Sequence, residues 1–171
     1  MKNKVIIILL IFTFLLTACT GNPQSADNLR ELKTANDSVM DQKCEDFINN
    51  FSQNYPNFEL LDYILGSDEN SPIQLVVVAK NKETDSSSTL FVLDNNGVGQ
   101  VILASEYSAT YRKQDRLKID KNIISISLNL AISKEKTEIH DFNITVTQEE
   151  NQGKLNTLYS SEEKIRGVFS E

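Results

Sequence analysis

The fold of this chain is decided by Ile124-Ser125-Ile126-Ser127-Leu128-Asn129-Leu130-Ala131-Ile132. Large apolar side chains alternate here with small or polar ones, a period of two that places the two kinds on opposite faces of a strand. The stretch therefore predicts a half-buried β-strand, and the same period governs most of the chain on either side of it.

About seven strands are predicted, joined by turns. None of the connections is long enough to hold a crossover helix, so the strands must pair antiparallel. Asn95-Asn96-Gly97 is the kind of turn that closes a tight hairpin. The last ten residues are charged, which suggests a short helix or a frayed end. The predicted strands are 58–65, 73–80, 89–94, 100–105, a strand from Leu117 that breaks at 120–122 and resumes over 124–132, 142–147 and 154–159.

An amphipathic helix is predicted before the strands, from Asp37 onward. Its apolar residues recur at i, i+4, i+7, i+8 and i+11, which forms one stripe on a helix. Ser38 and Asp41 offer a capping box at its start, and Tyr55-Pro56 ends it because the residue before proline avoids the helical conformation. The stripe consists of Met40, Cys44, Phe47, Ile48 and Phe51.

The predicted fold class follows from these two patterns. It is mainly β (α+β), with the N-terminal helix packed on an antiparallel meander sheet or on a small two-sheet β domain. Cys44 lies in the middle of the helix stripe, so we expect it in the core.

The N-terminus has the layout of a secretory signal: Lys2 and Lys4, the uncharged apolar run 5–16, then small residues. The run is too short to cross a bilayer, which takes about 20 residues. Leu16-Thr17-Ala18-Cys19 resembles the lipobox of bacterial lipoproteins. The alternatives are an ordinary signal peptide that happens to be cleaved before a cysteine, and a cytoplasmic chain that begins with a buried strand.

The lipobox resemblance implies cleavage between Ala18 and Cys19 and lipid attached to Cys19. It implies permanent anchoring, because one acyl chain binds membranes only marginally and such lipoproteins carry at least two. The expected location is the extracytoplasmic face of the cell membrane. The outer membrane is possible in a double-membrane source, since Thr20 follows the cysteine rather than aspartate. The expected parts are a signal peptide at 1–18, a flexible tether at 19–36 and one domain at 37–171.

The composition is acidic. The signal holds two of the 17 basic residues and none of the 24 acidic ones, which leaves the mature chain with a net charge of −9. Such a surface argues against nucleic acid as a partner. If Cys19 is lipidated, an intramolecular disulfide with Cys44 is excluded.

A further resemblance covers 47–161 and rests on four stretches: Asp62-Tyr63-Ile64-Leu65-Gly66, 75–79, Leu90-Phe91-Val92-Leu93-Asp94-Asn95-Asn96-Gly97 and 117–126. Small secreted bacterial proteins with a single degenerate FG-GAP (integrin-like propeller) unit show a similar series of strands and turns. The resemblance implies a calcium-type loop after Gly66, where this chain has Ser67-Asp68-Glu69-Asn70 without the family's alternating Asp/Asn spacing and glycine. We expect a polar turn there and no metal or other cofactor.

Few residues suggest catalysis. Cys44 and the single histidine, His140, could act as nucleophile and base, but no oxyanion motif or orienting residue accompanies them, and we favour structural roles. Zinc sites need about four ligands, and cysteine and histidine are too scarce. Tyr107, Tyr111 and Arg112 fall in a polar connection over 106–116, which makes them candidate binding residues.

The sequence thus predicts a lipid-anchored, non-enzymatic binding or accessory module at the cell surface, with an unknown protein, peptide or glycan partner. One alternative is a surface hydrolase that uses carboxylates on wall or peptide substrates. Another is a self-protection (immunity-type) lipoprotein.

Overall fold

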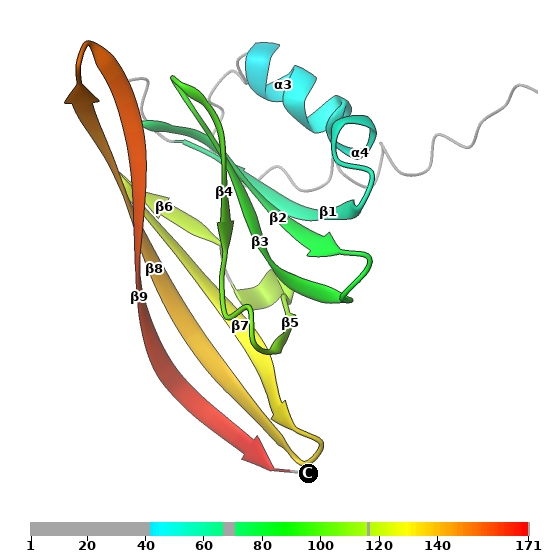
Figure 1. The fold of residues 1–171 in the computed structure, drawn as a ribbon. Coiled ribbons are helices and arrows are strands. Elements are labelled where there is room, and N and C mark those ends of the chain that lie inside the picture. The colour runs from blue at the N-terminus through cyan, green and yellow to red at the C-terminus, as the bar shows by residue number, and fades with distance from the viewer. Residues whose placement is uncertain (1–41, 67–70, 116, 171) are drawn as a thin grey trace, which may run out of the picture. The chain divides into compact units, whose positions relative to one another are not determined.

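The computed structural model describes residues 42–66, 71–115 and 117–170, and Figure 1 draws its ribbon. These residues belong to one compact unit that runs from residue 37 to residue 171. In the described part, two short helices precede nine strands, and the strands form two antiparallel sheets. The predicted fold class is confirmed in its two-sheet form.

Two helices stand where one was predicted: α3 (Gln42–Asn49) and α4 (Phe51–Asn54). The break is at Asn50, whose side-chain amide donates to the carbonyl of Asp46 at 2.8 Å. Asparagine competes in this way with the helical backbone, although the apolar stripe continues across the break. The predicted capping box and Met40 lie outside the described residues. Within the described part of the chain, neither helix is long and apolar enough to cross a membrane.

The first sheet is a meander of four strands in chain order: β1 (Phe58–Leu65), β2 (Ile73–Asn81), β3 (Ser86–Asp94) and β4 (Gly97–Ile102). The predicted turn between β3 and β4 is confirmed. One carboxylate oxygen of Asp94 accepts hydrogen bonds from the backbone amides of Asn96 and Gly97, at 2.6 and 2.9 Å. Gly97 has a φ of +143°, which suits a residue without a Cβ.

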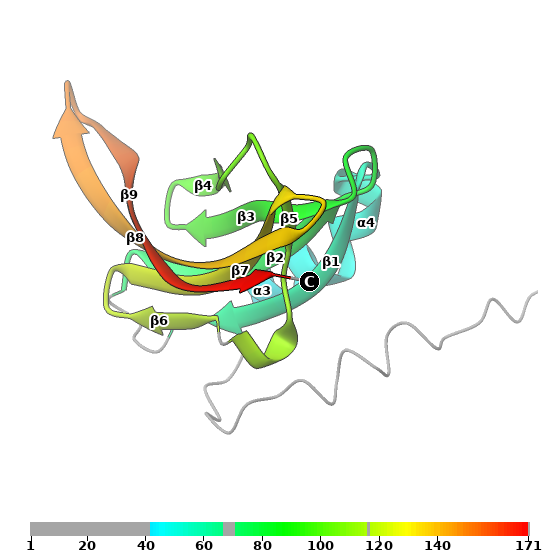
Figure 2. The ribbon, with the colours of Figure 1, turned by 90° about the horizontal axis from the view of Figure 1, so that it is seen from below.

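The second sheet has the order β5-β7-β8-β9, and the short strand β6 pairs with β7 as well. The alternating stretch 124–132 forms the centre of β7. The tip of the β8–β9 hairpin extends past the other strands in both views of the ribbon (Figures 1 and 2). The bounds are β5 (Ser108–Thr110), β6 (Lys118–Asp120), β7 (Ile123–Ser133), β8 (Lys136–Asn151) and β9 (Lys154–Ser170), with a 3-10 turn at Lys113–Asp115.

The prediction for the C-terminus was wrong. Residues 162–170 form neither a helix nor a frayed end but the second half of β9, paired with β8 except at Arg166. A charged sequence can form this strand because β9 lies at the sheet edge and is mostly exposed. The turn before it is tighter than predicted and consists of Gln152 and Gly153, both with positive φ, as a two-residue hairpin requires.

The main core lies between the two sheets. From β7, Ile124, Ile126, Leu128 and Leu130 are buried, as their alternation predicted. They meet apolar side chains of the first sheet, among them Ile73, Val76, Val78, Leu90 and Val92. Both faces of the first sheet are therefore occupied, because the helices cover its other side.

The second core lies between the helices and the first sheet. Cys44 is buried there, which confirms its predicted place in the core. Aromatic rings dominate this layer: Phe91 lies at the centre, with the rings of Phe51, Tyr55 and Phe58 around it. Such ring pairs add to the stabilisation that burial of their area gives.

Candidate functional site

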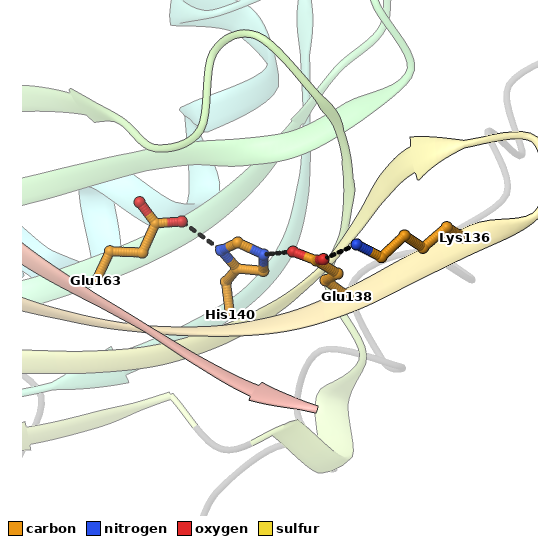
Figure 3. Close-up of polar contacts among 4 residues, drawn as sticks. All are labelled: Lys136, Glu138, His140 and Glu163. Atoms are coloured by element: carbon orange, nitrogen blue, oxygen red, sulfur yellow. Dashed lines mark hydrogen bonds and ion pairs between the residues drawn. The ribbon is translucent and has the colours of Figure 1, made fainter. Parts of the chain in front are cut away.

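A charged cluster lies on the core-facing side of the second sheet. Lys136, Glu138 and His140 alternate along β8 on the same face as the buried Phe142. Glu163 comes from β9, directly across from Phe142. Figure 3 shows the four side chains in a row, and we call them the His140 cluster. Glu138 and His140 are buried, which is unusual for side chains that carry charge.

Both ring nitrogens of His140 face carboxylates. Nε2 lies 2.8 Å from a carboxylate oxygen of Glu138, and Nδ1 contacts Glu163. Each ring nitrogen of His140 therefore has a carboxylate within hydrogen-bonding reach. The other oxygen of Glu138 lies 2.6 Å from Nζ of Lys136. The row therefore alternates basic and acidic side chains, each in contact with one of the other kind.

The pKa of Glu138 reflects these partners. The hydrogen bond from Lys136 lowers it from the ordinary value of 4.5, the hydrogen bond from His140 lowers it further, and both outweigh the opposing effect of desolvation. A carboxyl group with a lowered pKa in the folded state contributes stability above its unfolded pKa. That contribution is lost as the pH falls through the folded value.

We therefore expect Glu138→Gln to lower the free energy of unfolding at pH 7, and this loss to shrink as the pH falls below 4.5. Denaturant unfolding of both proteins at neutral and acidic pH measures the difference. Glu150→Gln, at an exposed position near the hairpin tip of the same strand, is the matched control and should leave stability unchanged. A loss that is the same at every pH would contradict this account of Glu138.

The His140 cluster does not favour acid-base catalysis. A general base needs a ring nitrogen that can take a proton from the substrate, and both nitrogens of His140 are engaged by carboxylates. Glu138 and Glu163 converge on the imidazole, not on an open site. Among the described residues, no group of three or more His, Cys, Asp or Glu side chains could hold a metal ion. What the arrangement does chemically is to bind β9 to β8 through paired charges.

The other candidate residues are placed apart from one another. Cys44 packs in the core between the helices and the first sheet, whereas His140 belongs to the second sheet, so the two are not brought together as nucleophile and base. Tyr111 belongs to the polar connection over 106–116 whose residues were predicted as candidate binding residues. It is buried, and its hydroxyl donates to Asp62 at 2.5 Å. Tyr107 and Arg112 are exposed on either side of β5, a strand that the sequence analysis missed.

Two predicted sites lie outside the described residues. They are the lipobox with its cleavage site at Ala18 and Cys19, and the polar loop Ser67-Asp68-Glu69-Asn70. The predictions for them stand as sequence predictions.

The first half of β9 is fixed against the first sheet. The Thr157 hydroxyl donates to Asp94 at 2.5 Å and accepts from the side chain of Asn96 at 3.1 Å. Tyr159 lies over Gly99 so closely that a Cβ on that glycine would come within 2.1 Å of the phenol oxygen. Burial and the nearby Asp94 raise the pKa of Tyr159 to about 12. This half of β9 is therefore held against the first sheet by Thr157 and Tyr159.

The outer edge of β9 is the surface that the sequence analysis did not find. β9 is the last strand of its sheet, and β8 is its one neighbour among the described residues. Several large apolar side chains are exposed along it: Leu155, Leu158, Ile165, Val168 and Phe169.

The sequence offered a signal for the His140 cluster, since the alternation that buries Phe142 and Ile144 also places His140 and Glu138 inward. It offered none for the edge, because which strand ends a sheet depends on the tertiary fold.

Comparison of the chain with protein families, with curated proteins and with solved structures found no match.

Proposed function

We propose that this chain is a lipid-anchored protein of the extracytoplasmic face of the cell membrane, and that its β domain is a non-enzymatic binding module. The observation that carries the binding function is the exposed edge of β9, a strand of 17 residues. The lipobox resemblance supports the location.

The edge of β9 is suited to take up another strand. An edge strand presents a row of backbone amides and carbonyls, and an extended segment of another chain can pair with them. Proteins that avoid such pairing shorten the edge or interrupt it with bulges and charges. In β9 the bulge and most of the charges lie in the second half, where the register with β8 shifts and leaves Arg166 opposite no residue. The first half is regular, and Leu155 and Leu158 are exposed on it.

The occupant that fits this surface is a β-strand of another protein chain at the same membrane surface. Backbone pairing supplies affinity, and side chains on alternate positions supply selectivity. The predicted tether over 19–36 would span roughly 60 Å when fully extended, which allows the domain to reach neighbouring proteins. Among the described residues, Cys44 and His140 lie apart, and the carboxyl groups of Glu138 and Glu163 converge on an imidazole.

Labelling with a fatty-acid analogue in cells tests the location. We expect label on the wild-type protein and on Cys44→Ala, which serves as the matched cysteine control, and none on Cys19→Ala, because the lipobox places the lipid on Cys19. Equal labelling of Cys19→Ala and the wild type would contradict the proposed anchor, and so would an unlabelled wild-type protein.

A further inference from the structure

We propose that the strand that pairs with the edge of β9 is β9 of a second copy of this chain, antiparallel to the first and centred on Leu158. The inference rests on the proposed function, since it names the partner of the same edge. The paired segment is 154–162, which we call the pairing segment.

Charge complementarity selects this register. When two antiparallel copies are centred on Leu158, Lys154 of each copy lies opposite Glu162 of the other. The two-fold symmetry makes this pair occur twice. Opposite charges across a strand pair stabilise it, and like charges destabilise it. Asn156 lies opposite Ser160, so no like charges face each other within the pairing segment.

Neighbouring registers lack this complementarity. A pairing centred on Tyr159 would set Lys154 opposite Lys164 of the other copy. A pairing centred on Glu162, Glu163 or Lys164 would set that charge opposite itself. The register centred on Leu158 is therefore favoured over these by charge alone.

The apolar side chains agree with the same register. Tyr159 packs against the core between the sheets, so the alternation of the strand turns Leu158 to the outer face, where 46% of it is exposed. In the proposed pair each Leu158 meets the Leu158 of the other copy at the symmetry axis. This contact removes apolar surface from water that the single chain leaves exposed.

The pairing segment is also held in a regular conformation before any partner arrives. Its register with β8 is unbroken, and the shift at His140 comes only after it. The hydrogen bond from Thr157 to Asp94 fixes it against the first sheet. Little further ordering is then needed on pairing, which lowers the entropic cost of association. A strand-only contact is small, so we expect the pair to form chiefly where lipid anchors concentrate the copies on one surface.

Disulfide trapping on intact membranes that carry the full lipid-anchored protein tests the proposal. Leu158→Cys places two thiols opposite each other at the symmetry axis, within the reach of a disulfide. We expect a mild oxidant to link this variant into a species of twice the monomer mass. Phe169→Cys, also exposed on β9 but outside the pairing segment, is the matched control and should stay monomeric.

Charge reversal tests the register. Lys154→Glu in the Leu158→Cys background should reduce the trapped dimer roughly tenfold, because two favourable pairs become two repulsive ones. Adding Glu162→Lys should restore it, which also shows that the single variant is folded. If the copies associated without a defined register, adding Glu162→Lys would not restore the trapped dimer.

Other results would overturn the second copy as partner. A disulfide adduct of Leu158→Cys with a different protein would do so while leaving the binding function in place. A purely monomeric Leu158→Cys on membranes, with fatty-acid label still on the protein, would overturn the pairing but not the anchor. Trapping that is equally efficient at Phe169→Cys would overturn the register.

Discussion

Phe91→Ala should lower the free energy of unfolding by about 3–5 kcal/mol. Phe91 is 1% exposed, and its ring centroid lies 5.1 Å from that of Phe51, 4.5 Å from that of Tyr55 and 5.1 Å from that of Phe58. Truncation leaves a cavity between the helices and the first sheet, and these rings cannot all move to fill it. The free energy of unfolding of a domain of this size is about 5–15 kcal/mol in total, so much of the stability depends on this side chain.

Denaturant unfolding followed by circular dichroism measures the effect of Phe91→Ala. The matched control is Phe169→Ala, the same chemical change at a side chain that is 56% exposed on β9. We expect the control to change stability by less than about 0.5 kcal/mol. Similar losses in the two variants would mean that the helices do not depend on Phe91 for their attachment.

His140→Ala should cost about 2–3 kcal/mol, somewhat less than the loss of one partner from a fully buried ion pair, because Glu163 is half exposed. The substitution removes the imidazole that lies between Glu138 and Glu163 and leaves the two carboxyl groups facing each other. It should also loosen the second half of β9, which amide hydrogen exchange would show as faster exchange over 163–170.

A second variant separates the contribution of charge to stability from the contribution of packing at His140. Adding Glu163→Gln to His140→Ala removes one of the two like charges, so part of the lost stability should return. Thr147→Ala, at an exposed position of the same strand, should have little effect. If the double variant is no more stable than His140→Ala, the side chain acts through packing alone and the paired charges of the His140 cluster do not stabilise the hairpin.

Local pattern was sufficient to predict the strands that bury one face. The predicted and observed bounds of the first strand, Phe58–Leu65, are the same, and the alternation in 124–132 became the centre of β7. The Asn95-Asn96 turn was predictable because its conformation depends on nearby residues, including the Asp94 carboxylate. The proline after Tyr55 likewise marked the end of the helical segment.

The elements that sequence did not predict depend on tertiary contacts. β5 has three residues, too few to show a period, and exists because it pairs with β7. The second half of β9 has no apolar alternation and is a strand because β8 templates it. Asn50 interrupts a stripe that continues in register on both sides, so the stripe alone predicted one helix.

The candidate site was predictable only in part. The inward direction of Glu138 and His140 follows from alternation with Phe142, but Glu163 reaches His140 only through the register of β8 and β9. For Tyr111, the sequence did not predict that the side chain is buried. Its neighbours predicted only a polar connection, whereas its own side chain is buried and its hydroxyl donates to Asp62.

The central proposal is that this domain works at a membrane surface, held there by lipid on Cys19. The most direct test is the mass of the N-terminal peptide of the mature protein, extracted from membranes. The account predicts a chain that begins at Cys19 and carries the added mass of two or three acyl chains. An unmodified Cys19, or a chain that retains residues 1–18, would contradict it and would leave Cys19 able to form other bonds.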